Sequence, residues 1–154
     1  IDLLEDAVHF ANRMKVVVVA SSGNNPNTNK NYPASFNDSW VLKVGGSDKL
    51  GFYNSTSTYG NGVDLVAPAD PVVVYTIDKS DGSYKHFGGT SASAPHVSGA
   101  SALLLSNFNQ STASINNLAP EDVEVLLQLT ADDIFAPPAT NGYDLRTGFG
   151  KLNN

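Results

Sequence analysis

The sequence of 154 residues contains no cysteine. This absence excludes a disulfide framework, structural zinc held by thiolates and a cysteine nucleophile, although it leaves the cellular compartment open. Basic residues are scarce too, since nine Lys and Arg stand against fifteen Asp and Glu and give a net charge of -6. A nucleic-acid interface needs clustered Lys and Arg, and here they are scattered, so we expect no nucleic-acid partner.

Long apolar runs are also missing. No stretch approaches the roughly 20 residues of a membrane-spanning helix, so we expect no membrane span. We expect no signal peptide within this sequence, and because the first residue is Ile1 rather than Met we expect an excerpt or a processed product. With 41% hydrophobic and 16% charged residues, the composition fits one globular domain or part of one.

The hydrophobic pattern predicts an α/β fold with a mixed or parallel sheet. Apolar residues recur at helical spacing through residues 1–15, and the valine run at 16–20 suits a strand buried on both faces, as in a parallel sheet covered by helices. The Asn-, Ser- and Pro-rich segment 21–39 predicts a long surface loop at the carboxyl end of that strand, where active sites of such folds gather. Further strands are expected at 40–45, 62–68 and 72–77, with a turn over 78–87.

Two more helices are expected in the second half of the chain. The helix over residues 91–107 carries small residues on its first turns, so it must lie very close to its neighbour. The segment APEDVEVLLQLT places Pro120 in a first turn, with acidic residues beside it that complement the positive end of the helix dipole. We expect this last helix to be peripheral.

The start of the helix at 91 is the candidate reactive centre. Ser91 follows a Gly-Gly-Thr turn, so its hydroxyl lies near unpaired backbone N–H groups that stabilise an anion. If Ser91 attacks a carbonyl, the developing oxyanion sits beside those donors, and Gly88 and Gly89 allow a substrate backbone to approach. Taken alone, the more economical interpretation is that Ser91 only caps the helix, which contributes about 1 kcal/mol.

Other catalytic signatures fail. G-T-S-A-S lacks the second glycine of the G-x-S-x-G nucleophile elbow, and no S-x-x-K of the β-lactamase kind occurs. The chain has no H-E-x-x-H, which excludes that kind of zinc protease in this segment.

The phrase GGTSASAPHVSGASALLL, however, closely resembles the nucleophile motif of the subtilisin-like serine peptidases, the subtilases. That motif reads G-T-S, two or three small residues, then P-H-V-x-G. The agreement falls at Gly89, Thr90, Ser91, Pro95, His96, Val97 and Gly99. NYPASF, VLKVGG, GVDLVAPA and GYDLRTGFGKLN also follow the family's order and spacing, so the similarity covers nearly the whole chain.

A second match, VVVVASSGNN, resembles the family's strand that ends before the oxyanion-binding asparagine. The resemblance implies that Ser91 is the nucleophile, that Asn24 donates to the oxyanion, and that Ser21, Ser22 and Gly23 form a wall of the pocket for the substrate residue before the cut. Judged without the Ser91 motif, Asn24 is only a turn residue in an Asn-rich loop.

The three histidines are not expected to supply the general base. His96 follows Ser91 by five positions, an offset of ~140° around one helix axis, so its ring cannot readily reach the Ser91 hydroxyl. The resemblance makes His96 structural, with backbone or side-chain partners. His9 and His86 fit surface or packing roles, although His86 lies near Ser91 in sequence.

The resemblance also shows what this chain lacks. Subtilases have a D-T/S-G motif and an H-G-T motif upstream of the strand that corresponds to residues 16–20, and neither motif occurs here. We therefore expect residues 1–154 to be the carboxyl-terminal half of a three-layer subtilisin-like catalytic domain with a mostly parallel sheet. The parent would be a secreted or cell-surface serine endopeptidase acting on proteins or peptides, and this half alone would be inactive.

Two alternatives remain open at the level of sequence. The chain could belong to a non-catalytic subtilase-like module that binds peptides or partners, or it could be a structural remnant or an assembly subunit completed by another chain. The upstream sequence would separate the first alternative from an enzyme.

Metal binding is only weakly indicated. Asp64 stands where some relatives place a carboxylate near a loop cation, but Gly62 replaces their second acid, so we assign no metal ligand and no required cofactor. Structural calcium elsewhere in a full domain is compatible with the resemblance.

Overall fold

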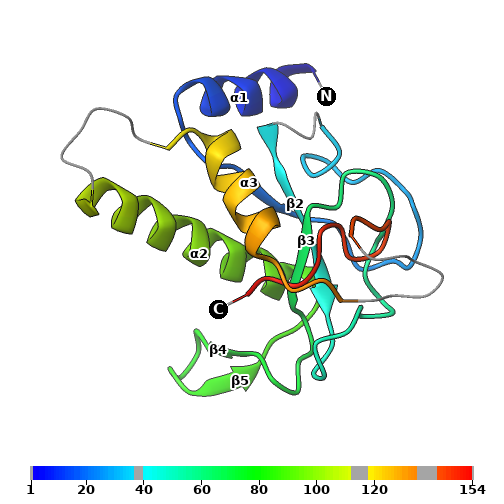
Figure 1. The fold of residues 1–154 in the computed structure, drawn as a ribbon. Coiled ribbons are helices and arrows are strands. Elements are labelled where there is room, and N and C mark those ends of the chain that lie inside the picture. Colours follow the sequence, from blue (N-terminus) through cyan, green and yellow to red (C-terminus); the bar gives the residue numbers. More distant parts are fainter. Residues whose placement is uncertain (1, 37–39, 112–117, 135–141, 154) are drawn as a thin grey trace.

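The computed structural model describes residues 2–36, 40–111, 118–134 and 142–153, without the side chains of 109–111. Figure 1 shows a parallel sheet flanked by helices, with a small hairpin projecting below it. The elements are α1 (Asp2–Arg13), β1 (Val19–Ser21), β2 (Leu42–Ser47), β3 (Leu65–Pro68), β4 (Tyr75–Ile77), β5 (Tyr84–His86), α2 (Thr90–Ser111) and α3 (Pro120–Thr130).

The sheet has the order β1-β2-β3, and both pairs of neighbours are parallel. Val19 pairs with Leu42, and Val44 pairs with Leu65, so every second side chain along the strands falls on the same face. The α/β prediction is confirmed, with each of these strands beginning somewhat later than the sequence pattern suggested.

The two faces of the sheet are covered by different helices. On one face, α2 and α3 pack on the strands, and that cluster comprises Leu42, Val44, Leu65, Ala67, Val97, Val123, Leu127 and Leu152. On the other face, α1 and part of the following loop pack on the strands through Val8, Ala20, Ala34, Phe36 and Val41. This arrangement of a helical layer on each side of a parallel sheet is the expected three-layer fold.

The last helix is not peripheral, and that expectation was wrong. Val123 and Leu127 are buried in the core cluster with Val97 of α2, because the apolar stripe of α3 faces the sheet rather than the solvent. Only its remaining faces are exposed.

The valine run was also partly misread. Only residues 19–21 form β1, and Val16 is 51% exposed. Val16 precedes the strand, and its N–H donates to Ala11 O of α1 at 3.0 Å, so it ends the helix rather than entering the sheet. Among the residues that the structure describes, β1 pairs with β2 alone and is therefore an edge strand.

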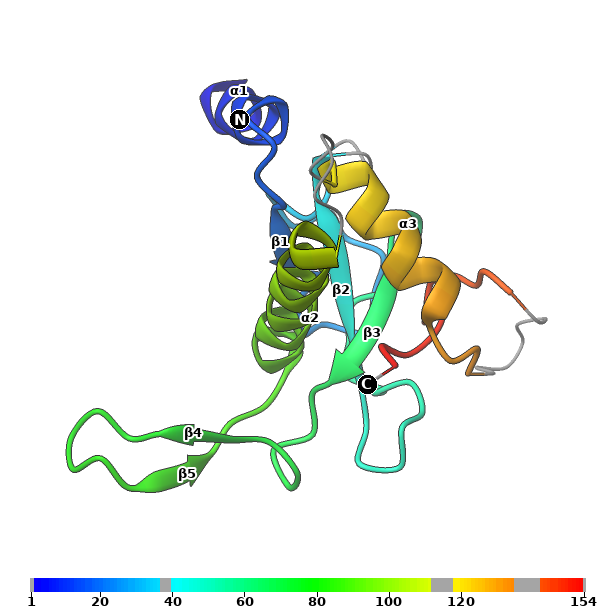
Figure 2. The same cartoon turned by 60° about the vertical axis from the view of Figure 1, so that its left-hand side comes forward.

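Residues 72–87 contain an antiparallel hairpin. The turn predicted over 78–87 is shorter than expected, because β5 occupies Tyr84–His86 within that range. Tyr75 pairs with His86 and Ile77 pairs with Tyr84, and both side chains of the second pair are largely exposed. Figure 2 shows the hairpin of β4 and β5 extending away from the sheet and helices.

Candidate active site

The candidate site forms where α2 begins at the carboxyl ends of the parallel strands. The backbone N–H of Gly89 donates to Ala69 O at 2.7 Å, and the Ser93 hydroxyl donates to Ala67 O at 2.9 Å. Ala92 is fully buried against its surroundings, which confirms that the first turn of α2 lies very close to its neighbour. Further along α2, however, a Cβ added at Gly99 would meet nothing within 4 Å.

Ser91 lies on the first turn of α2 and is exposed. Its hydroxyl has no hydrogen-bond partner among the residues that the structure describes. The Thr90 N–H donates to Asn24 Oδ1 at 2.8 Å and the Ala92 N–H donates to Gly89 O at 2.8 Å. The Ser91 N–H has no partner among the described residues, so it can donate to an incoming oxygen.

Asn24 belongs to the loop after β1, yet it lies beside the first turn of α2, which contains Ser91. Its Oδ1 accepts hydrogen bonds from the Thr90 N–H at 2.8 Å and from the Thr90 hydroxyl at 3.0 Å. Because Oδ1 is held in this way, the Nδ2 group, which has no partner within the described residues, remains available as a donor. Thr90 is thus the residue that orients the asparagine amide, a role that the sequence analysis missed.

Gly89 permits this approach. Its φ of +79° lies in the left-handed region, and a Cβ added there would lie 2.8 Å from Asn24 Oδ1 and 3.1 Å from Nδ2. Only glycine combines this backbone conformation with the space that the asparagine amide occupies.

An open pocket of about 550 Å³ adjoins Ser91. Ser21 and Gly23 line it, but the side chain of Ser22 faces the interior and donates to Thr58 O at 2.9 Å. Any contact of Ser22 with a ligand would therefore come from its backbone. That these residues bind a substrate remains a prediction. The full lining is Val19, Ala20, Ser21, Gly23, Asn31, Tyr32, Pro33, Ser91 and Ala94, none of them charged.

The opposite side of that pocket is formed by a segment that the sequence analysis treated only as loop. Asn31 reaches back to the strand end and donates from Nδ2 to Ser22 O at 2.7 Å. The Asn-Tyr-Pro phrase at 31–33 matched the family's order, and that match was the available signal for these lining residues.

The histidines all have partners other than Ser91. His96 Nδ1 lies 2.8 Å from Ala92 O, so of the two kinds of partner that were expected the structure has a backbone carbonyl, and the residue is exposed. His9 stacks on Trp40 with ring centroids 4.2 Å apart. His86 Nδ1 bonds to the carbonyl of Pro71, at the base of the hairpin.

Asp64 is bonded within the protein. Its Oδ2 accepts from the Lys43 N–H at 2.6 Å, and its Oδ1 accepts from Gln128 Nε2 at 3.0 Å. The part of the chain that the structure describes contains no group of three or more His, Cys, Asp or Glu side chains placed to hold a metal ion. The assignment of no metal ligand remains a prediction.

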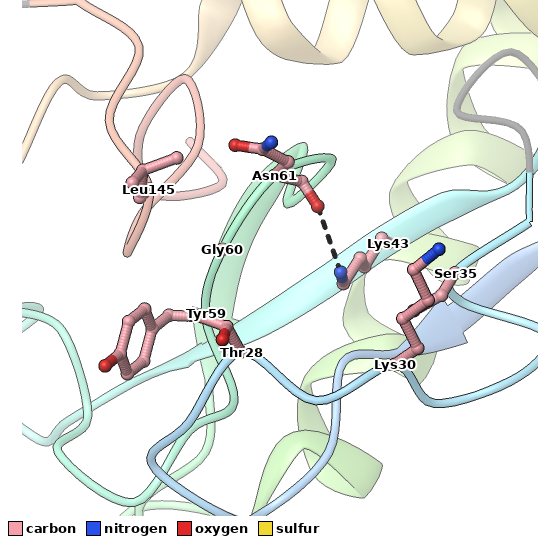
Figure 3. Close-up of a pocket in the computed structure, with 8 residues that line it drawn as sticks. All are labelled: Thr28, Lys30, Ser35, Lys43, Tyr59, Gly60, Asn61 and Leu145. Atoms are coloured by element: carbon pink, nitrogen blue, oxygen red, sulfur yellow. Dashed lines mark hydrogen bonds between the residues drawn. The ribbon is translucent and has the colours of Figure 1, made fainter.

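A second pocket of about 430 Å³ is lined in part by Lys43 of β2 (Figure 3). The buried Lys43 side chain donates from Nζ to Asn61 O at 3.2 Å. The lining also includes Thr28 and Ser35, and residues of the same loop, 31–33, line the pocket at Ser91.

The fold and the site together define an α/β protein with an exposed serine and a polar amide donor gathered at the carboxyl edge of a parallel sheet. A profile described as the subtilase family matches residues 2–150, so the chain belongs to the subtilase family. The fold matches that of subtilisin-like protease domains.

Several relatives are known by sequence and by structure. The thermophilic serine proteinase of Bacillus sp. strain AK1 is 37% identical over 151 residues, covering 98% of this chain and 33% of that protein. Thermitase of Thermoactinomyces vulgaris is 36% identical over 119 residues, covering 75% of this chain and 41% of thermitase. The prenylagaramide maturation protease PagA superposes with a TM-score of 0.82 at 28% identity, covering 99% of this chain and 53% of that one. The chain thus spans from about a third to about half the length of these relatives.

Proposed function

We propose that this chain is the carboxyl-terminal part of a catalytic domain and that the whole protein is a serine endopeptidase. The observation that carries the proposal is the pairing of an exposed Ser91 with the Asn24 amide, whose orientation Thr90 fixes. A scaffold has no physical need for such a donor beside a serine.

In the proposed reaction, Ser91 Oγ attacks the carbonyl carbon of a peptide bond. An upstream histidine, oriented by an upstream aspartate, accepts the Ser91 proton and later delivers it to the leaving amine. The oxyanion accepts hydrogen bonds from the Ser91 N–H and from Asn24 Nδ2, and water then hydrolyses the acyl-enzyme.

The uncharged lining of the pocket at Ser91 supports a preference for one kind of substrate side chain. Its volume of about 550 Å³ suits a large side chain, and a charged side chain would lose hydration there without gaining a charged partner. We therefore expect an apolar or aromatic residue before the cut.

The unpaired edge of β1 supports the proposal that an upstream half of the domain packs beside this strand. The other edge of the sheet is already occupied, because the Val66 N–H donates to Gly150 O and the Leu152 N–H donates to Val66 O, both near 2.9 Å. An upstream segment could therefore add strands beside β1 and bring the missing aspartate and histidine. Without it, the isolated chain should be inactive.

The cellular location and the partners of the protein are also proposed, by analogy with its relatives. A cell wall-associated protease of Bacillus subtilis strain 168 is 29% identical over 157 residues. Within the described residues, no helix has the length and apolar character to cross a membrane. We propose a secreted or cell-surface location, with protein or peptide substrates, no nucleic-acid partner, no required cofactor, and any calcium confined to the rest of the domain.

Labelling with a fluorophosphonate, read by intact mass, tests the proposal. The full-length protein should gain one adduct, the Ser91→Ala variant should gain none, and residues 1–154 alone should stay unlabelled because the base is missing. A folded full-length protein that also stays unlabelled would instead support the non-catalytic binding module.

A further inference from the structure

The position of Asn24 is set by its neighbours rather than by its own backbone. Neither the N–H nor the C=O of Asn24 bonds to any residue that the structure describes. Gly23 and Asn25, on either side, are both hydrogen bonded, so they determine where the Asn24 side chain begins.

One buried residue, Thr58, holds both of these neighbours. Its N–H donates to Gly23 O at 2.9 Å, and its hydroxyl donates to Asn25 O at 2.7 Å while accepting from the Asn25 N–H at 3.2 Å. Its carbonyl in turn accepts from the Ser22 hydroxyl at 2.9 Å. The backbone and the side chain of Thr58 therefore both form hydrogen bonds to the turn that contains Asn24.

The packing around Thr58 leaves this turn little freedom. Thr58 is fully buried, and a Cβ added at Gly23, whose φ is +116°, would lie 2.8 Å from Thr58 Oγ1. The hydroxyl thus lies directly against the turn.

Thr90 holds the same turn from the other side. Its hydroxyl accepts from the Gly23 N–H at 3.2 Å and donates to Asn24 Oδ1 at 3.0 Å. We propose that Thr58 is a positioning residue for the oxyanion site: it fixes the backbone on both sides of Asn24, while Thr90 fixes the amide. A displacement of about 1 Å in such a donor can cost roughly 100-fold in rate.

This inference rests on the proposed function and adds a second residue through which that function acts. A purely structural role for Thr58 would also explain its burial. The two roles differ in their effect on kcat, because a structural residue lowers the folded fraction without changing turnover by the folded protein.

Thr58→Val in the full-length protein is the direct test, since valine keeps the shape and the backbone bonds but removes the hydroxyl. With a p-nitroanilide peptide ending in phenylalanine, kcat should fall about 10- to 100-fold and KM should change little. Thr58→Ser should restore most of kcat because it restores the hydroxyl. Thr56→Val is the matched control, since Thr56 is an exposed neighbour whose hydroxyl donates to Asn54 Oδ1 at 2.8 Å and to no other described residue, and its kcat should be unchanged.

The same substitution in an Asn24→Ala background separates positioning from other effects. If Thr58 acts through Asn24, Thr58→Val should lower kcat no further once the amide is gone. An equal fall in both backgrounds, or an unchanged kcat in the wild-type background, would overturn the inference. If Thr58→Val does not fold, Thr58→Cys takes its place, with a smaller fall in kcat because a thiol is a weak donor.

The failure of the proposed function has a different signature. If the wild-type full-length protein neither turns over the peptide nor labels at Ser91, the peptidase proposal fails and the positioning role fails with it. If the wild type is active and labelled while Thr58→Val keeps full kcat, only the positioning role fails.

Discussion

At the scale of single residues, the site depends on a few backbone conformations that only glycine adopts readily. Gly23 and Gly89 both have positive φ values, and each would meet an Asn side chain within 3 Å if it carried a Cβ. The polar residues Asn24, Thr58 and Thr90 therefore form their network around two positions where no side chain fits. This explains why glycine precedes Asn24 in one turn and Thr90 in the other.

Gly89→Ala should lower both stability and turnover of the full-length protein. The substitution adds left-handed strain of about 1–2 kcal/mol and pushes the methyl group against Asn24. Gly82→Ala is the matched control, because Gly82 has a similar φ of +74° but nothing within 4 Å of its added Cβ. Thermal unfolding should show a loss in both variants, whereas peptide hydrolysis should fall only for Gly89→Ala, and equal rates in the two would contradict this account.

At the scale of elements, cation–π contacts join the loop that contains Tyr53 and Tyr59 to the distant segment around Arg146. The guanidinium carbon of Arg146 lies 5.4 Å from the Tyr53 ring centroid and 5.8 Å from that of Tyr59. The Tyr53 hydroxyl donates to Ser57 O at 2.6 Å, and burial raises the pKa of Tyr53 above its ordinary 10.0. The loop that contains Thr58 is thereby tied to the chain's closing segment.

The raised pKa of Tyr53 predicts a loss of stability in strong alkali. A group with a higher pKa in the folded state binds its proton more tightly there, so its contribution is complete below pH 10 and is lost as the pH rises through the folded-state pKa. Tyr53→Phe should flatten this part of the profile of unfolding free energy against pH. Tyr84→Phe should leave it unchanged, because Tyr84 is 79% exposed on the hairpin; a profile identical in Tyr53→Phe and wild type would contradict the assignment.

At the scale of the whole molecule, large apolar side chains are exposed on several elements of the chain. Leu3 of α1 is 85% exposed, Ile77 of the hairpin is 63% exposed and Leu103 of α2 is 66% exposed. These side chains lie on three different elements, while the edge of β1 has no strand partner among the described residues. The surfaces fit a protein in which further chain covers them.

Residues 1–154 in isolation should therefore bind the dye ANS and self-associate, whereas the full-length protein should do neither. Apolar area is the cause, so raising the ionic strength should not reverse the association. Dye fluorescence and size-exclusion chromatography measure both effects. A monomeric chain that does not bind the dye would show that these surfaces need no further cover and would weaken the proposal of an upstream half.

The sequence alone was sufficient where a local pattern has one physical meaning. Apolar residues at helical spacing predicted α1, the unbroken valine run predicted a buried strand, and turn residues predicted the bend between β4 and β5. The pattern also predicted the helix α3, but it predicted neither the burial of α3 in the core nor the exposure of Val16, since burial depends on which elements lie beside a residue.

The candidate site divides in the same way. Ser91 and Asn24 could be named from motifs, and their family is confirmed, while their catalytic roles remain predictions. The contacts of Thr58 and Thr90 with the turn at Asn24 could not be read from the sequence, because they join residues 33 and 66 positions apart. The sequence determined which chemical groups the chain carries and the period of its helices and strands; only the tertiary structure decided which groups meet, because hydrogen bonds and burial depend on distances in space.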